Sequence, residues 1–183
     1  MRLLFVIALQ PPAIGGAEIK ASRLARALVS RGHRVTILTR RLPNTERREI
    51  VGGVKTIRIG KETDSRADII GFAKEIFNRR EKFNVIHNFL LSSLTNACCF
   101  AGKRLGKPVI ISIGGTGKFG GPRDTSGFGR LSWLKWRHIA ASGAKFICPS
   151  PQSRQEFASA GIAENRVFCV PNPVDTTVFK PAS

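Results

Sequence analysis

Strands and helices are predicted to alternate along this chain, which indicates an α/β fold: a Rossmann-like, doubly wound and mostly parallel sheet in three layers (α/β/α). Short runs of apolar and β-branched residues recur between longer stretches of helical spacing, and the hydrophobic period changes each time. The chain has 183 residues and a hydrophobic content of 42%, which is enough for one compact domain with its own core. We count about seven strands.

The first strand, turn and helix set the pattern. Residues 2–9 form an apolar run typical of a strand that is buried on both faces. Residues 10–16 contain two prolines and two glycines, which exclude a helix and let a ligand approach the backbone closely. An amphipathic helix follows over 17–31, then a second strand over 34–39. Free N–H groups at the start of that helix favour an anion, most often a phosphate.

The rest of the chain repeats this unit. Residues 49–59 carry spaced apolar positions interrupted by Gly52-Gly53, which predicts a short hairpin or a bent strand. Further helices are predicted from their apolar spacing, and further strands from short β-branched runs. We expect these helices over 68–81, 91–105, 130–142 and 151–161, and these strands over 84–87, 109–113, 145–148 and 166–170.

Two loops at one edge of the predicted sheet are rich in glycine. In a doubly wound sheet, ligands bind beyond the C-terminal ends of the strands. The loops expected there include residues 10–16 and residues 114–129. Because glycine leaves backbone N–H groups accessible, both loops favour a phosphate or a sugar.

The chain is strongly basic, with 30 Lys and Arg against 12 Asp and Glu and a formal charge of +18. This excess favours anionic partners such as phospholipid headgroups, nucleic acids or phosphorylated substrates, without selecting among them. The basic residues are spread along the chain, and no aromatic stacking platform accompanies them, which argues against nucleic acid. No apolar run approaches the roughly 20 residues of a membrane span, so we expect a soluble, cytoplasmic domain.

Three other kinds of site are disfavoured. The four cysteines lack the Cys-x-x-Cys spacing of a zinc or redox site, and we expect them to be reduced thiols in the core. A nicotinamide dehydrogenase would need Gly-x-Gly-x-x-Gly and an acidic residue after the second strand, where this chain has Thr39-Arg40-Arg41. The serines have no matching base and acid for a hydrolase triad.

Several motifs together carry a family resemblance. Pro-Pro-x-x-Gly-Gly-Ala-Glu opens the first helix, Phe-Asn-Val-Ile-His precedes the middle of the chain, and Val-Pro-Asn-Pro-Val-Asp follows the last strand. The combination resembles the N-terminal half of family-4 glycosyltransferases, which are retaining enzymes with the GT-B fold. The likeness spans essentially the whole chain.

This resemblance implies half of an enzyme. In that family two Rossmann-like domains face each other across a cleft: the C-terminal domain holds a nucleoside diphosphate sugar, and the N-terminal domain shapes the acceptor site. Residues 1–170 would be the acceptor-side domain and 171–183 the start of the interdomain linker, with the donor-binding domain absent from this chain. The whole protein would transfer a hexosyl or related sugar to a glycan or lipid-linked acceptor, in polysaccharide, lipopolysaccharide or glycolipid assembly. We expect no cofactor and no required metal, a peripheral position on the inner face of an anionic membrane, and no activity of this part alone.

The resemblance also assigns residues of the first turn. Gly15 and Gly16 match the family's glycine turn, which contacts the donor diphosphate, in agreement with an anion at a helix N-terminus. Glu18 is either a substrate contact or an acid in the first turn that interacts favourably with the helix dipole. Both interpretations of Glu18 stay open.

A second set of candidates follows the fourth strand. The family often has a functional histidine two positions after His87, where this chain has Phe89. We therefore expect His87, at the end of that strand, to be a buried structural residue. Asn88 then becomes the nearest polar candidate for substrate binding.

The third set lies in the loop after the fifth strand. Many family members have a histidine there, whereas this chain has Gly115, Thr116 and Lys118 within a glycine-rich run. These residues would suit a phosphate or carboxylate of the acceptor, and the alternative is a surface loop without a ligand. A second function of a different class is a stand-alone basic Rossmann-like module that binds phosphorylated ligands or nucleic acid.

Overall fold

Eight strands lie side by side in one sheet, in the order β3-β4-β2-β1-β5-β6-β7-β8, within the part of the chain that the structure describes. The structure is a computed structural model, and it describes residues 1–61, 68–115 and 132–173. Neighbouring strands pair in parallel, except that β3 and β4 are antiparallel. The strands are β1 (Arg2–Val6), β2 (Arg34–Arg40), β3 (Arg48–Val51), β4 (Val54–Ile59), β5 (Val85–Phe89), β6 (Val109–Ser112), β7 (Lys145–Cys148) and β8 (Val167–Cys169).

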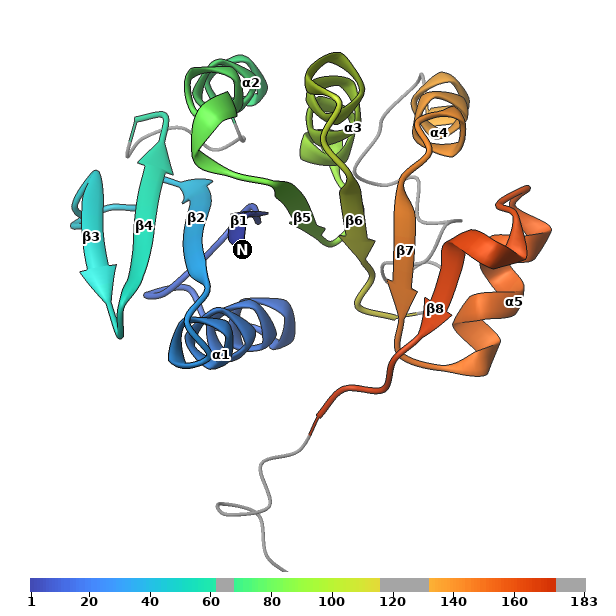
Figure 1. Ribbon diagram of the computed structural model, residues 1–183, viewed down its shortest axis with the longest axis horizontal. Coiled ribbons are helices and arrows are strands. Elements are labelled where there is room, and N and C mark those ends of the chain that lie inside the picture. Colours follow the sequence, from blue (N-terminus) through green and yellow to red (C-terminus); the bar gives the residue numbers. More distant parts are fainter. Residues whose placement is uncertain (62–67, 116–131, 174–183) are drawn as a thin grey trace, which may run out of the picture.

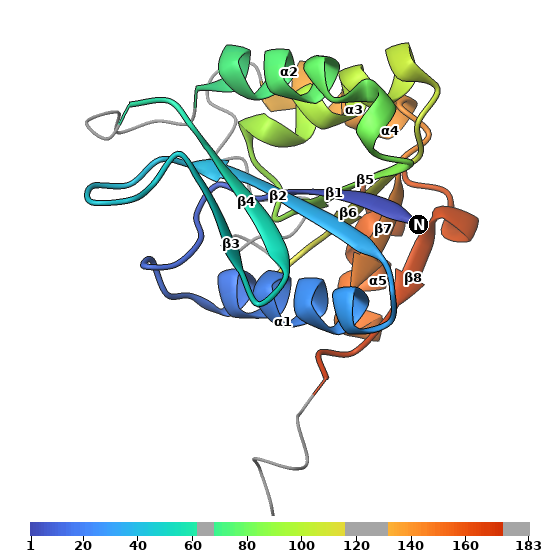
Figure 2. The same cartoon turned by 60° about the vertical axis from the view of Figure 1, so that its left-hand side comes forward.

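Helices cover both faces of this sheet, which confirms the predicted α/β/α layering (Figure 1). Helices α2, α3 and α4 lie on one face, and α1 and α5 lie on the other; the rotated view in Figure 2 shows the same two layers. The helices are α1 (Gly16–Ser30), α2 (Ile69–Asn78), α3 (Ser93–Leu105), α4 (Ser132–Ala141) and α5 (Pro151–Ser159), with short 3-10 turns η1 (Arg80–Lys82) and η3 (Glu164–Arg166).

The first strand shows how the apolar run of the sequence fills both halves of the core. Successive side chains of a strand point to opposite faces. Leu4 and Val6 accordingly belong to a core cluster that includes residues of α2, α3 and α4, whereas Phe5 and Ile7 belong to a second cluster beneath α1. All four side chains are buried. Burial on both faces therefore explains why this central parallel strand is apolar at successive positions after Arg2.

The interrupted segment 49–59 forms a hairpin. Gly52 and Gly53 both have positive φ angles, 57° and 76°, as expected of a two-residue turn whose twist matches that of the flanking strands. Of the two predicted alternatives, a short hairpin or a bent strand, the structure has the hairpin, which supplies the two strands β3 and β4. The sheet formed by the described residues therefore has eight strands, against the predicted count of about seven.

Other differences from the sequence prediction are local. Strand β5 continues to Phe89, two residues further than predicted, and the helix predicted over 68–81 ends at Asn78 and continues as η1. Cys98, Cys99 and Cys148 are buried as expected, but Cys169 is exposed, so its prediction as a core thiol is wrong. Within the described segments, none of the helices combines the length and the apolar character needed to span a membrane.

Candidate functional site

A cleft of about 350 Å³ opens where the first turn of α1 meets the C-terminal ends of β5 and β6. This is the edge of the sheet at which ligands of doubly wound folds bind. The cleft brings together two predicted residues, Gly16 and Glu18, with residues that follow β5 and β6 in the chain. Its lining residues are Gly16, Ala17, Glu18, Lys20, Phe89, Leu90, Ser112, Ile113, Gly114 and Asn172.

The first turn of α1 presents its backbone to this cleft. Gly15 is the N-cap residue and contributes no side-chain hydrogen bond to the helix. The N–H groups of the first turn have no partner within the helix itself, so they and the helix dipole favour an anion. A Cβ atom at Gly16 would meet nothing within 4 Å. Packing therefore does not require glycine at position 16, and its absence of a side chain leaves the backbone open to a ligand.

Glu18 and Lys20 add charge to the same turn. A Cβ atom at Gly15 would overlap Oε2 of Glu18, so this carboxylate folds back over the N-cap, where an acid is favourable. Glu18 also lines the cleft, so the geometry accommodates both interpretations made from the sequence. Burial lowers the pKa of Lys20, which lies one helical turn beyond Gly16. Sequence analysis missed Lys20, although its i, i+4 spacing from Gly16 on a predicted helix was a usable signal.

A buried histidine is hydrogen-bonded to one of the residues that line the cleft. His87 is 5% exposed, and its Nε2 lies 2.7 Å from Oγ of Ser112, a cleft residue. Its ring stacks on Phe89 with a centroid distance of 4.2 Å and meets the ring of Phe5 edge-on. Burial, and to a smaller extent the positive charge of Lys20, lowers the pKa of His87 to about 3. His87 is thus a neutral, buried residue as expected, but it lies inside β5 and not at its end.

Asn88 lies in the core and not in the cleft. Its side chain is fully buried. Nδ2 donates a hydrogen bond to the carbonyl oxygen of Val6 (3.1 Å), and Oδ1 accepts one from Oγ1 of Thr95 (2.7 Å). The carboxamide therefore joins β1, β5 and α3. The sequence predicted that Asn88 follows the strand and faces a substrate. Because β5 continues to Phe89, Asn88 instead lies within the buried strand, and we leave it out of the proposed site.

The loop after β6 enters the cleft through Gly114, and Gly115 follows it, half-buried. A Cβ atom at Gly114 would lie 2.8 Å from Cδ2 of Leu90, so a side chain at position 114 would require the end of the Leu90 side chain to shift. The N–H group of Leu90 donates to the carbonyl oxygen of Ser112 (2.8 Å), and Leu90 has an unusual φ of 66°. The predicted residues Thr116 and Lys118 lie outside the described residues.

Two further cleft residues escaped the sequence analysis. Ser112 is the last residue of β6, and Asn172 follows β8 near the end of the described chain. Asn172 belongs to the Pro-Asn-Pro-Val-Asp motif. The sequence placed this motif both at the start of the linker and among the loops at the ligand-binding edge of the sheet, but it did not single out Asn172. Among the described residues, no group of three or more His, Cys, Asp or Glu side chains is arranged to hold a metal ion.

Comparison with known proteins gives one family and several structural neighbours. Residues 14–178 match the model of Glycosyltransferase Family 4. The chain is 25% identical over 197 residues to a phosphatidylinositol N-acetylglucosaminyltransferase subunit from Arabidopsis thaliana, an alignment that covers 100% of this chain and 42% of that protein.

Two solved structures show the same fold at low sequence identity. Sucrose-phosphate synthase from Thermosynechococcus elongatus superposes with a TM-score of 0.71 at 16% identity, over 98% of this chain and 50% of that one. Anabaena HepE in complex with UDP-glucose gives a TM-score of 0.68 at 12% identity, over 98% of this chain and 46% of that one. The chain thus spans about half the length of these relatives, or somewhat less.

Proposed function

The chain belongs to glycosyltransferase family 4, and we propose that it is the N-terminal, acceptor-side half of an enzyme. The enzyme transfers a sugar from a nucleoside diphosphate sugar to a glycan or lipid-linked acceptor. The anomeric configuration of the sugar is retained in this transfer. The observation that carries this proposal is the open backbone at Gly16, at the N-terminus of α1 and on the wall of the cleft. An anionic diphosphate is the kind of group that such a helix start stabilises. HepE, a structural neighbour with this fold, was solved with UDP-glucose.

The chemistry of the reaction gives this helix start a role. In sugar transfer, the bond between the anomeric carbon and the diphosphate breaks, and the electron pair stays on the departing diphosphate. Groups that stabilise this developing negative charge lower the barrier. We propose that the dipole of α1 and the ammonium group of Lys20, a residue that lines the cleft, do so without a cofactor or a required metal.

The partner half would supply the rest of the site. The proposed domain comprises residues 1–170, the linker begins at 171–183, and a second domain would hold the nucleotide part of the donor. The lengths of the relatives support this division, because this chain spans about half of each. Asn172 supports it as well, since the start of the proposed linker already lies on the cleft. On this account residues 1–183 alone are inactive.

We also propose that the enzyme binds to a membrane, where its acceptor would lie. The chain carries a formal charge of +18, which favours an anionic bilayer surface. Helices α2, α3 and α4 cover one face of the sheet (Figure 1), and each exposes a large apolar residue: Ile70 (81% exposed), Phe100 (51%) and Trp133 (57%). The plant relative is, by name, a transferase that acts on phosphatidylinositol, a lipid. We propose peripheral binding through this helix layer and a lipid-linked acceptor.

Sugar transfer by the whole enzyme tests the proposal. The enzyme with its donor-binding domain would be incubated with labelled nucleoside diphosphate sugars and a membrane extract as the source of acceptor. We expect label to move into a glycan or lipid from at least one donor, and no transfer by residues 1–183 alone. If neither donor binding nor transfer occurs and the chain instead binds nucleic acid saturably, the proposal is wrong.

A further inference from the structure

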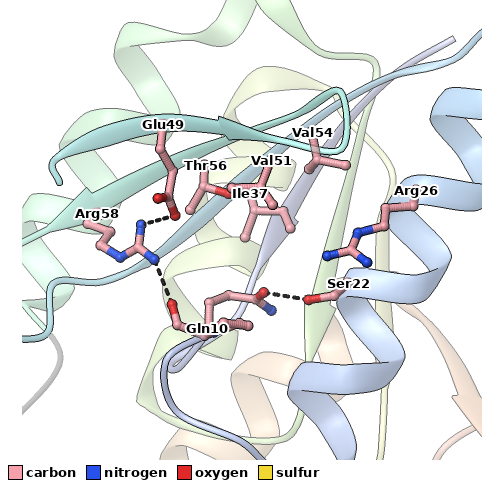
Figure 3. Close-up of a pocket in the computed structure, with 10 residues that line it drawn as sticks. Gln10, Ser22, Arg26, Ile37, Glu49, Val51, Val54, Thr56 and Arg58 are labelled. Carbon is pink, nitrogen blue, oxygen red and sulfur yellow. Dashed lines mark hydrogen bonds and ion pairs between the residues drawn. The ribbon is translucent and has the colours of Figure 1, made fainter. Parts of the chain in front are cut away.

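A second cavity, of about 80 Å³, lies between α1 and the β3–β4 hairpin (Figure 3). We call it the hairpin cavity. Part of its lining is apolar, with Pro11, Ile37 from β2 and two valines of the hairpin; its polar side chains are those of Gln10, Ser22, Arg26, Glu49, Thr56 and Arg58. None of its lining residues lines the cleft described above. It is therefore a separate site.

Two buried side chains in this lining have polar atoms without a protein partner. Gln10 is 4% exposed; its Oε1 accepts a hydrogen bond from Oγ of Ser22 (2.8 Å), and its Nε2 has no partner among the described residues. With the amide turned over, Oε1 would be the unpartnered atom, so one polar atom is left over in either orientation. Buried polar groups are nearly always hydrogen-bonded, which makes this atom a candidate ligand contact.

Arg58 is also buried and also has a polar atom without a protein partner among the described residues. This side chain is 5% exposed in a chain whose other arginines lie mostly at the surface. Its Nη1 pairs with Oε1 of Glu49 (2.5 Å), and its Nη2 donates to the carbonyl oxygen of Pro11 (2.7 Å), as the dashed lines in Figure 3 show. Its Nε has no partner within the described part of the chain. A buried guanidinium with a free N–H group can donate to one further oxygen ligand.

The charge of the cavity favours an anion. Glu49 offsets Arg58, so Arg26, which is exposed at the rim, leaves a net positive charge. The hairpin turn lies close to α1 at this rim: a Cβ atom at Gly52 would lie 3.2 Å from Nε of Arg26, and one at Gly53 would lie 2.9 Å from Cγ1 of Val29. The glycine pair thus lets the turn pack closely on α1 next to Arg26, which lines the cavity (Figure 3).

We propose that the hairpin cavity is a binding site for a small oxyanion, a phosphate or carboxylate group, held by Arg26, the Nε of Arg58 and the amide of Gln10. Its volume is several times the roughly 10–15 Å³ that one water requires, and it is too small for a nucleotide. Guanidinium groups are the preferred partners of phosphate and carboxylate oxygens. The proposal does not depend on sugar transfer, because the two sites share no residue.

Titration calorimetry tests this site. Inorganic phosphate and, separately, acetate would be titrated into the 183-residue chain at constant ionic strength, because a charge of +18 also attracts anions non-specifically. We expect saturable binding of one anion per chain, and the arm that saturates identifies the group. Arg26→Gln should weaken binding about tenfold, the effect of losing one charge-assisted hydrogen bond. Arg23→Gln is the matched control: it removes the same charge from an exposed position of α1 that does not line the cavity, and it should bind like the wild type.

A second variant keeps the test decisive. Gln10→Glu changes the shape of the side chain very little but places a carboxylate against the ligand, so phosphate and acetate binding should be lost while the circular dichroism spectrum is unchanged. Equal weakening by Arg26→Gln and Arg23→Gln would overturn the proposal. So would wild-type affinity in Gln10→Glu, an absence of saturation with both anions, or equal binding of uncharged glycerol.

Discussion

Nε2 of His87 lies 2.7 Å from Oγ of Ser112, and this hydrogen bond joins β5 to β6 next to the cleft, which Ser112 lines. The imidazole packs against the rings of Phe5 and Phe89, which also contact each other, and it is almost completely buried. A charge at this position would lack solvation, so the histidine stays neutral, and packing and one neutral hydrogen bond hold it against Ser112.

The first prediction concerns how the stability of the protein depends on pH through His87. Burial lowers the pKa of His87 in the folded protein to about 3, against 6.5 in an unfolded chain. Between these values the unfolded chain binds a proton that the folded protein does not, so the free energy of unfolding falls as the pH falls. The loss from this group is at most roughly 1.4 kcal/mol per pH unit. Urea unfolding across this pH window should give a shallower pH dependence for His87→Gln than for the wild type. Identical slopes would show that His87 does not titrate in this way.

The second prediction concerns the buried carboxamide that ties β1, β5 and α3 together. Asn88→Ala leaves the carbonyl of Val6 and the hydroxyl of Thr95 without this partner, and should lower the free energy of unfolding by about 2–3 kcal/mol. Asn84→Ala is the matched control, because Asn84 is exposed and accepts one hydrogen bond from the N–H of Arg2. Its cost should stay below about 1 kcal/mol. Chemical denaturation measures both, and equal costs would contradict the structural role of Asn88.

Local sequence signals predicted much of this architecture. The apolar run of β1 and the amphipathic α1 each depend on neighbouring residues, and both were confirmed. For the Gly52-Gly53 segment, the hairpin was one of the two predicted alternatives, and it is the one observed. The strand count was one too low because the sequence does not decide whether a glycine pair bends one strand or separates two.

The site was less predictable, because its geometry depends on residues far apart in the chain. Asn88 lies in the core, where its side chain donates a hydrogen bond to the carbonyl oxygen of Val6, a residue 82 positions away in the sequence. Ser112 and Asn172 reach the cleft only through the order of the strands. Gly16 could be predicted, since a glycine turn before a helix is itself an anion-binding pattern.

The third prediction concerns the exposed apolar residues on the α2–α3–α4 layer. Ile70→Ser should reduce binding of the chain to vesicles that contain anionic phospholipid, and Trp133→Ser should do the same, by roughly threefold to tenfold each, since each removes apolar surface. Ile50→Ser is the control, because Ile50 is similarly exposed but lies on β3. Sedimentation with the vesicles measures the bound fraction. An equal loss of vesicle binding in Ile70→Ser and Ile50→Ser would exclude this orientation. Vesicle binding that does not change with salt concentration or with the content of anionic lipid would contradict the proposed binding to an anionic membrane.

The central claim is that the backbone at Gly16 is open because a diphosphate binds there. Its most direct measurement is sugar transfer by Gly16→Val in the whole enzyme, beside the stability of the same variant. A Cβ atom at Gly16 meets nothing within 4 Å, so the free energy of unfolding should change by no more than about 0.5 kcal/mol. Transfer should nevertheless fall at least tenfold, whereas Ser30→Val, at the far end of α1, should retain it. A Gly16→Val enzyme that is folded and transfers sugar at the wild-type rate would contradict the account.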